Sequence, residues 1–358
     1  MSNASSEAVR QHNIIGYKAS DSAFERNKND GARWFFEKTN LGLFIHFGIS
    51  AAGDDIDISW GMMDNPDRRA KGNGILTPNE YWSLAKKFNP QHFEPEKWLS
   101  AAKNAGFSYA VFTTKHHDGY ALWPSDFGDF STKQYLGGRD LVGEYVSACR
   151  KVGLKVGLYY SPPDWRLDRK YMSFASGSRS EKYPDRPHED PDHKPIGDLP
   201  EMPEEHKRLR VSVFNGQLRE LLTRYGQIDL LWFDGTLPSL DGAMTIGEIR
   251  ELQPQIIVND RLWGAGDYCS RFECKLPTEK PGMPWETAQI WHVGGGWSYV
   301  RNADKYRAPE ITFHQYEVAK KFGGNLLLNI APDGDGVVPE AYYVALERLK
   351  NDIASAAK

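Results

Sequence analysis

Side chains suited to acid–base or nucleophilic chemistry follow several short apolar runs of this 358-residue chain. Neither the Ser/His/Asp order with a nucleophile elbow nor the HExxH pattern of a zinc protease occurs. The inventory instead combines carboxylates, histidines and tryptophans, as glycoside hydrolysis requires: one carboxylate attacks or assists and another donates a proton. The polar clusters at the ends of the expected strands are His46, Lys115–Asp118, Ser161–Trp165, Asp234 and Asn259–Arg261.

Asp234 in the stretch DLLWFDG is the sharpest single candidate. A carboxylate at the end of a buried strand is costly unless a partner or a ligand uses it. The alternative is an ordinary Asp-Gly turn, in which the aspartate only shapes the backbone. Both interpretations stay open from the local sequence alone.

Short, continuous apolar runs are typical of strands that are buried on both faces, as in a parallel sheet. Helical patterns at 95–106, 139–153 and 205–226 precede the second, third and fourth of the runs, so the order is strand, helix, strand. This alternation predicts parallel strands with crossover helices. The apolar runs lie at 41–50, 108–115, 154–162, 228–235, 255–260 and 325–332.

Chemistry at the carboxyl ends of successive strands favours a (β/α)8-type, TIM-like catalytic barrel. A doubly wound sheet is less favoured, because no GxGxxG follows the first strand. The barrel is predicted over residues 23–352, somewhat irregular after residue 260, with residues 1–22 as a disordered tail or tag remnant. The charged, proline-rich segment 166–205 is predicted to be a solvated loop insertion that can still rim the pocket.

The composition excludes several classes of function. The net charge is -4 and no long Lys/Arg run occurs, so we expect no nucleic-acid partner. No apolar stretch approaches the roughly 18 residues that span a bilayer, so we expect no membrane partner. Three cysteines without CxxC spacing argue against a disulfide framework or a zinc site. The opening MSNASSEAVR reads as a tag that replaced a native leader, so a periplasmic or secreted location is expected, with the cytoplasm left open.

Over roughly residues 30 to 350, the chain resembles the α-L-fucosidases of glycoside hydrolase family 29. The resemblance implies a somewhat irregular (β/α)8 barrel that cleaves α-L-fucosides with retention of configuration, without a metal or an organic cofactor. The carbohydrate substrate is then the expected partner, and the oligomeric state stays undetermined. The motifs that carry the resemblance are IHFG, TTKHHDGYALW, RDLVGEYVSACRKVGLKVGLYYSPPDW, DLLWFDG, NDR, WET, GWSY and GGNLLLNIAPDGDG.

Carried over by motif, the resemblance makes Asp234 the nucleophile, and the histidines the groups that bind the fucose hydroxyls. Neutral imidazoles both donate and accept hydrogen bonds, so several around one ring can read hydroxyl orientation. The acid/base is expected at Glu273, in a segment similar to the family pattern GDF-x-TPE, or alternatively at Glu286 of WET. The expected substrate-binding residues are His46, Trp60, His116, His117, Trp123, Tyr160, Trp165, Trp232, Arg261 and Trp297.

Two departures from the family pattern bear on specificity and domain content. Ser59 precedes Trp60 where the family commonly has glutamate, so Asp54, Asp55 or Asp57 of the same loop is a candidate replacement. Many members also carry a β-sandwich after the barrel, which is not expected in this chain. Besides release of terminal α-L-fucose, two alternatives remain: an exo-glycosidase acting on α-L-galactosides, which differ by one hydroxyl at C6, and a non-catalytic fucose-binding barrel.

Overall fold

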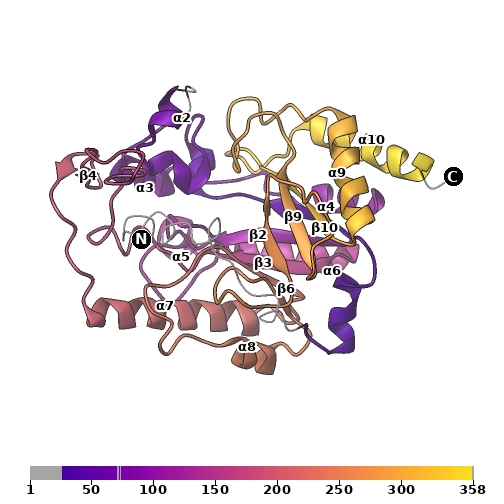
Figure 1. Ribbon diagram of the computed structural model, residues 1–358, viewed down its shortest axis with the longest axis horizontal. Helices are drawn as coiled ribbons and strands as arrows, with labels where there is room; N and C mark the ends of the chain where they lie inside the picture. Colours follow the sequence, from indigo (N-terminus) through magenta and orange to yellow (C-terminus); the bar gives the residue numbers. More distant parts are fainter. Residues whose placement is uncertain (1–25, 71, 73, 357–358) are drawn as a thin grey trace.

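The computed structural model describes residues 26–70, 72 and 74–356, so the tail expected over residues 1–22 lies outside the described part. Eight parallel strands form one sheet in the order β7-β6-β3-β2-β1-β10-β9-β8 (Figure 1). The strands are β1 (Leu41–Ile45), β2 (Tyr109–Lys115), β3 (Lys155–Tyr160), β6 (Leu230–Phe233), β7 (Ile257–Val258), β8 (Cys269–Glu273), β9 (Trp285–Ile290) and β10 (Asn325–Ile330).

The two outer strands of this sheet meet. A parallel bridge between Asn259 and Tyr268 joins the end of β7 to the start of β8. The Asp267 backbone N–H donates to the Val258 carbonyl (2.8 Å), and the Val258 N–H donates to the Asp267 carboxylate (2.8 Å). The predicted (β/α)8-type barrel is therefore confirmed, and this short contact joins β7 to β8.

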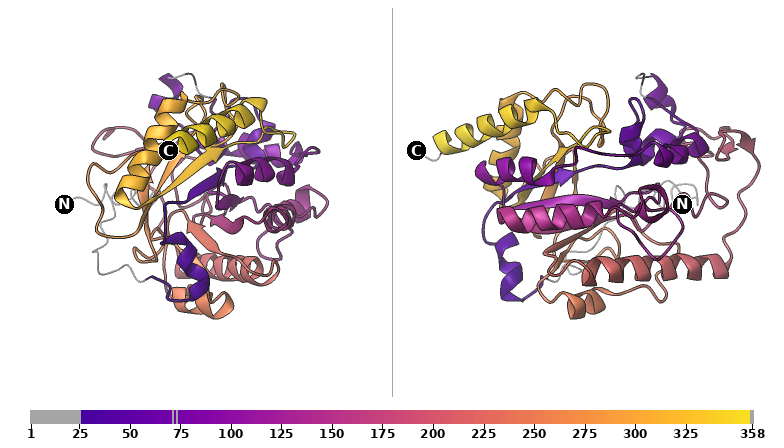
Figure 2. Two further views of the ribbon diagram at one scale, coloured as in Figure 1. Left: turned by 90° about the vertical axis from the view of Figure 1, so that its right-hand side faces the viewer. Right: turned by 180° about the vertical axis from the view of Figure 1, so that it is seen from behind.

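Helices cover the outside of the strands, as Figures 1 and 2 show. The predicted helix at 139–153 is observed as α6, which starts where the Asp140 side chain accepts from the Gly143 N–H and stops at Gly153 in the left-handed region (φ 76°). The larger helices are α4 (Pro95–Asn104), α6 (Leu141–Val152), α7 (Glu204–Thr223), α8 (Ile246–Leu252), α9 (Pro309–Phe322) and α10 (Glu340–Ala356). The short ones are η2 (Asp30–Phe35), η3 (Ile49–Ala52), η4 (Ile58–Met62), α2 (Pro66–Ala70), α3 (Pro78–Ser83), η5 (Leu84–Lys86) and α5 (Thr132–Tyr135).

The irregularity expected after residue 260 is observed. Between β7 and β9, residues 259–284 contain no helix, so β8 follows β7 without a crossover helix of its own. Residues 291–308, between β9 and α9, are likewise loops. This side of the barrel therefore positions its side chains on long connections rather than on helix-backed strands.

The barrel interior is filled by a compact aromatic cluster. Phe44, Tyr159 and Trp232 alternate with outward-facing neighbours on β1, β3 and β6, as strand geometry requires. At the amino end of the strands, Phe35 of η2 packs against Tyr268 with ring centroids 4.5 Å apart. In the described part of the chain, aromatic side chains therefore plug this end, and a pocket opens at the carboxyl end.

The insertion 166–205 lies beside α2 and α3, as Figure 1 shows for β4 (His188–Glu189). Together with β5 (Pro195–Ile196), β4 forms a small antiparallel hairpin. The expectation of a wholly solvated loop is wrong for one part, because Phe174 is fully buried and packs edge-on against Trp82. Arg186 also forms an ion pair with Asp64 (2.9 Å), which ties the insertion to the loop after η4.

Among the described residues, no helix combines the length and apolar character needed to cross a membrane.

Candidate active site

The predicted polar groups converge at the carboxyl end of the barrel. His46 follows β1, His116 and His117 follow β2, and Asp234 follows β6. The rings of His46 and His116 lie 5.9 Å apart between centroids. Ligand atoms of His116, His117 and Asp234 lie within 4.8 Å of one another. One monosaccharide is large enough to touch all of them.

Arg261 joins the two carboxylates of the expected catalytic pair. Its Nη1 donates to Asp234 Oδ1 (2.9 Å) and its Nη2 donates to Glu273 Oε2 (2.8 Å). Its Nη2 and Nε also donate to the Ser270 carbonyl (2.8 and 3.3 Å), which fixes the guanidinium plane. Trp232 lies beneath the guanidinium, 4.1 Å from Arg261 Cζ to the ring centroid. The two carboxylates are thus held on either side of one planar cation.

Tyr159 and His117 also lie next to Asp234. The Tyr159 hydroxyl donates to its Oδ2 (2.7 Å), and His117 Nε2 lies 3.5 Å from the same oxygen. The backbone before it is fixed by Asn259, whose side chain accepts from the Phe233 N–H and donates to the Phe233 carbonyl, both at 2.9 Å. These contacts orient one carboxylate oxygen toward Arg261 and the other toward the pocket.

Each pocket histidine has its Nδ1 bound to a neutral side chain. His46 pairs with Asn329 Oδ1, His116 with Ser59 Oγ, and His117 with Ser161 Oγ, each at 2.6 Å. Such partners fix the orientation of each ring. Burial lowers the pKa of His46 and of His117 to about 4, so both imidazoles are neutral near pH 7. A neutral ring donates with one nitrogen and accepts with the other, which suits a sugar hydroxyl.

Aromatic side chains wall this pocket. Trp297 packs on His46 (4.9 Å between centroids), and Trp60 stands edge-on to His117 (5.4 Å). Trp165, whose ring lies 4.9 Å from that of His117 between centroids, is not among the lining residues. His117 and Arg261 are not among them either, although both lie next to Asp234. The lining residues are Phe44, His46, Trp60, His116, Tyr159, Trp232, Asp234, Glu273 and Trp297.

The two candidate acids lie at different depths in the barrel, since Glu273 pairs with Ala288, two residues beyond Glu286 on β9. Glu273 is the last residue of β8 and lines the pocket. Glu286 is the second residue of β9 and pairs with Asn325 at the start of β10, so it lies at the amino end. It is buried among donors from Tyr109 (2.5 Å), Trp232 (2.9 Å) and Tyr268 (3.4 Å). Glu286 therefore supports Trp232 from below and does not reach the pocket.

Two expected sugar contacts lie outside the pocket. Trp123 is fully buried and donates from Nε1 to Glu220 of α7 (2.8 Å), on the outer side of the strands. Tyr160 also points outward, because its hydroxyl donates to Gln217 of α7 (2.7 Å). The interpretation of both as substrate-binding residues is wrong. Its inward neighbour Tyr159 was missed, although it is paired in register with Trp232 and so shares its face.

No aspartate of the 54–57 loop replaces the missing glutamate. Asp57 is buried, but Oδ1 accepts from the Trp297 N–H (2.6 Å) and Oδ2 pairs with Arg68 (2.8 Å). Asp55 pairs with Arg301 (3.0 Å), and Asp54 is exposed. Ser59 itself holds His116 and accepts from the Asp118 N–H (2.8 Å). At this position the chain therefore supports a histidine rather than offering a carboxylate.

A metal ion is poorly suited to this pocket. Within the described part of the chain, His116, His117 and Asp234 form the one group of three possible ligands. However, Arg261 already places a positive charge 2.9 Å from the Asp234 carboxylate, and a divalent cation there would be repelled. The donors instead match a neutral polyhydroxylated ligand.

A (β/α)8-type barrel with paired carboxylates at its carboxyl end is typical of glycoside hydrolases. The family model described as Alpha-L-fucosidase matches residues 6–351. The chain therefore belongs to the alpha-L-fucosidase family.

Individual relatives agree with this assignment. Alpha-L-fucosidase 1 of Arabidopsis thaliana is 27% identical over 356 residues; the match covers 88% of this chain but only 59% of the plant protein. The solved structure of alpha-L-fucosidase isoenzyme 1 from Paenibacillus thiaminolyticus has a TM-score of 0.72 and 30% identity, over 91% of this chain and 76% of that one. The solved structure of a mutant of alpha-L-fucosidase AlfC in complex with 4-nitrophenyl-α-L-fucopyranoside has a TM-score of 0.70 and 27% identity. The match covers 92% of this chain and 100% of that one.

Proposed function

We propose that this protein hydrolyses terminal α-L-fucosides by double displacement, with retention of configuration. The observation that carries the proposal is the Asp234–Arg261–Glu273 arrangement at the mouth of the barrel. Retaining glycosidases hold their two carboxyl groups about 5–5.5 Å apart, and inverting ones about 6.5–9.5 Å. Two carboxylates that share one guanidinium favour the shorter separation.

Asp234 is the nucleophile of this mechanism. Its Oδ2 attacks the anomeric carbon while Glu273 gives a proton to the departing glycosidic oxygen, forming a fucosyl ester and a free alcohol. Glu273 then takes a proton from water, whose oxygen attacks the same carbon and releases fucose and the Asp234 carboxylate. Arg261 offsets the negative charge of both carboxylates, and Tyr159 orients the attacking oxygen.

Fucose is the proposed sugar because the pocket has two kinds of surface. The neutral imidazoles of His46 and His117 offer donors and acceptors for the ring hydroxyls, and the His116 ring lies beside them. Phe44, Trp232 and the other aromatic walls offer apolar contact for carbon–hydrogen faces and a methyl group. The plugged amino end leaves no second exit, which suits removal of one terminal residue. The presence of both carboxylates argues against a non-catalytic barrel, and nothing in the geometry favours α-L-galactosides.

The test is hydrolysis of 4-nitrophenyl α-L-fucopyranoside followed by proton NMR from the first minutes of reaction. We expect α-L-fucose to appear first and the β anomer to grow later by mutarotation. First appearance of β-L-fucose would overturn the retaining mechanism. Absence of hydrolysis by protein whose circular dichroism shows it to be folded would overturn the activity itself.

A further inference from the structure

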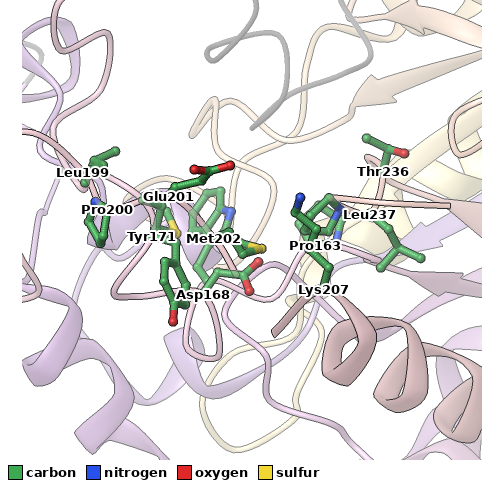
Figure 3. Close-up of a pocket in the computed structure, with 13 residues that line it drawn as sticks. Pro163, Asp168, Tyr171, Leu199, Pro200, Glu201, Met202, Lys207, Thr236 and Leu237 are labelled. Atoms are coloured by element: carbon green, nitrogen blue, oxygen red, sulfur yellow. The ribbon is translucent and has the colours of Figure 1, made fainter. Parts of the chain in front are cut away.

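The pocket that holds Asp234 and Glu273 is separate from a larger cavity at the same end of the barrel. That cavity, of about 690 Å³, lies between the loops after β3 and β6 and residues 199–202 (Figure 3). Among the described residues, none lines both hollows. The walls of the catalytic pocket therefore come from elsewhere, and two of them, Trp60 and Trp297, lie on the connections after β1 and β9.

Asp57 joins these two connections. It lies three residues before Trp60 and is 1% exposed. Its Oδ1 accepts from the backbone N–H groups of Trp297 (2.6 Å) and Ser298 (3.2 Å). Gly296 passes so close that a Cβ there would lie 2.9 Å from the Asp57 carboxyl carbon. The carboxylate of Asp57 therefore fixes the backbone that carries the Trp297 ring.

The Trp297 backbone is held on its carbonyl side as well. Its carbonyl accepts from Asn329 Nδ2 (2.7 Å), and Oδ1 of the same amide holds His46 Nδ1 (2.6 Å). The Trp297 ring also packs on the His46 ring, with centroids 4.9 Å apart. A shift of the Trp297 backbone would therefore disturb both an aromatic wall and the support of a pocket histidine.

The other oxygen of Asp57 pairs with a cation from α2. Arg68 Nη2 donates to Asp57 Oδ2 (2.8 Å), and the Arg68 side chain is 25% exposed. A carboxylate as deeply buried as Asp57 is costly without a positive partner. Arg69, the next residue of the same helix, pairs with Asp64 instead and is 55% exposed. Of the two adjacent arginines, Arg68 is thus the one that supports the Trp297 connection.

The helix α2 is itself held by the insertion 166–205. Asp64, just before the helix, pairs with Arg186 (2.9 Å), and Asp67 within it pairs with Lys182 (2.8 Å). The insertion therefore orients α2, and α2 places Arg68 on the buried carboxylate. A segment outside the pocket is connected in this way to one of the pocket walls.

We propose that Asp57 and Arg68 are positioning residues that hold Trp297 in place and thereby set the affinity of the pocket for its sugar. The proposal rests on the proposed fucosidase function, because it takes Trp297 as a wall of the sugar site. Trp297 packs on His46 and not on either catalytic carboxylate, so the ion pair contributes to binding of the sugar ring before and during the reaction. Loss of such uniform binding raises KM and leaves kcat nearly unchanged.

The experiment compares the two arginines of α2, with 4-nitrophenyl α-L-fucopyranoside as the substrate. In Arg68→Ala the carboxylate loses its hold on α2, so we expect KM to rise about tenfold and kcat to stay within about twofold of wild type. Arg69→Ala is the matched control, with both constants expected within about twofold. Arg68→Lys restores a cation and should recover part of the loss in KM. An unchanged KM in Arg68→Ala, or an equal rise in both alanine variants, would overturn the proposal.

Asp57→Asn breaks the same ion pair without leaving a buried charge unpaired, so it endangers the fold less than Arg68→Ala does. The amide oxygen can still accept from the two backbone N–H groups, while the bond to Arg68 is lost. We expect a several-fold rise in KM, and an unchanged KM in the folded variant would contradict the proposal.

A double-mutant cycle tests whether the ion pair acts through Trp297. Arg68→Ala is combined with Trp297→Ala, and KM is measured for both single variants and the double variant. If the pair works by placing the tryptophan, Arg68→Ala should raise KM by less than about twofold once the ring is gone. A full tenfold rise in the Trp297→Ala background would show that Arg68 acts on another part of the site.

A binding measurement separates this proposal from the proposed activity. L-Fucose is titrated by NMR against the wild type, Arg68→Ala and Arg69→Ala, which requires no turnover. Weaker binding in Arg68→Ala alone supports the positioning role even if no fucoside is cleaved. Equal affinity for L-fucose in all three proteins, together with cleavage of the aryl fucoside, overturns the positioning role and leaves the activity intact.

Discussion

Strand β6 is flanked by two buried aspartates whose surroundings differ. Asp229, just before the strand, accepts from the Val156 N–H (2.9 Å) and from Lys155 Nζ (3.0 Å), so it joins β6 to β3. Asp234, just after it, faces Arg261 and Tyr159 inside a pocket. Both are buried carboxylates with cationic partners. What distinguishes them is which end of the barrel they occupy.

Glu273 and Glu286, thirteen positions apart, also differ in their depth in the barrel. Glu273 ends β8 at the open end and is partly exposed. Glu286 begins β9 at the plugged end, and burial raises its pKa to about 7. A raised pKa is often read as a sign of a catalytic acid. Here the group with the raised pKa lies away from the substrate, so position in the barrel is the better guide.

The largest expected effect is the difference in kcat between substitutions of Asp234 and of Asp229. Asp234→Asn keeps the size of the side chain but cannot form the glycosyl ester, so we expect kcat on the aryl fucoside to fall by about 10⁴-fold or more. Asp229→Asn is the matched control, with kcat within about twofold of wild type and a loss of about 1–2 kcal/mol in unfolding free energy. Stopped assays of aryl fucoside hydrolysis measure kcat, and urea titrations measure the free energy of unfolding.

Azide sharpens this test. In Asp234→Gly, azide can enter from the side of the missing carboxylate and displace the aryl group directly, so the product should be β-L-fucosyl azide. Near-normal turnover in Asp234→Asn, or α-L-fucosyl azide from Asp234→Gly, would exclude Asp234 as the nucleophile.

The second effect is the difference in turnover between substitutions of Glu273 and of Glu286. Glu273→Ala is expected to lower kcat/KM on a fucosylated oligosaccharide by about 10²–10⁴-fold, because the alcohol leaving group needs a proton. A 4-nitrophenyl leaving group needs little protonation, so azide should restore its turnover and give α-L-fucosyl azide. Glu286→Gln should lower kcat on either substrate by less than about tenfold. Azide rescue of Glu286→Ala, with none for Glu273→Ala, would reverse the assignment.

The third effect concerns stability rather than turnover. The folded-state pKa of Glu286, about 7, lies above its ordinary value of 4.5, so between these pH values the folded protein binds more protons than the unfolded chain. The stabilising contribution of Glu286 to the free energy of unfolding is therefore fully present below about pH 4.5 and is lost as the pH rises through 7. Glutamine mimics the protonated form, and we expect Glu286→Gln to gain roughly 2–3 kcal/mol relative to wild type at pH 8 and little at pH 4.5.

Other buried carboxyl groups shift in the same direction; burial raises the pKa of Asp118 to about 6. For this reason the measured quantity is the difference between Glu286→Gln and wild type in urea titrations from pH 4.5 to 8. A difference independent of pH would show that Glu286 is ionised in the folded protein throughout this range.

The barrel and the convergence of its polar groups were predictable from the sequence. Apolar runs that end in His46, His116 and Asp234 determine both the strands and the end at which these residues meet. The closure through Asn259 and Tyr268 was not predictable, because a single bridge between short strands leaves no periodic pattern. The burial of Phe174 in a charged segment was missed for a related reason, since its packing partner Trp82 is distant in sequence.

The error at Tyr160 is explained by the register between β3 and β6. Since β3 and β6 lie side by side in register, Tyr159 shares a face with Trp232, and Tyr160 shares the opposite face with Phe233. A strand that ends one residue before a catalytic aspartate presents its second-last residue inward. With this register, assigning Trp232 to the pocket implies Tyr159, and not Tyr160. The choice of Trp123 had no such internal check.

The smallest effect distinguishes these neighbouring tyrosines. Tyr159→Phe removes the hydroxyl that donates to Asp234 Oδ2 (2.7 Å), so the nucleophile loses one of its orienting contacts. A hydrogen bond to a charged group is worth about 1.5–3 kcal/mol, and we expect kcat/KM on the aryl fucoside to fall about 10- to 100-fold. Tyr160→Phe removes a neutral bond to Gln217, which should lower the unfolding free energy by about 1 kcal/mol and leave kcat/KM within about twofold. Equal kinetic losses in the two variants would mean that Tyr159 acts through the packing of β3, and that Asp234 is oriented by Arg261 and His117 without it.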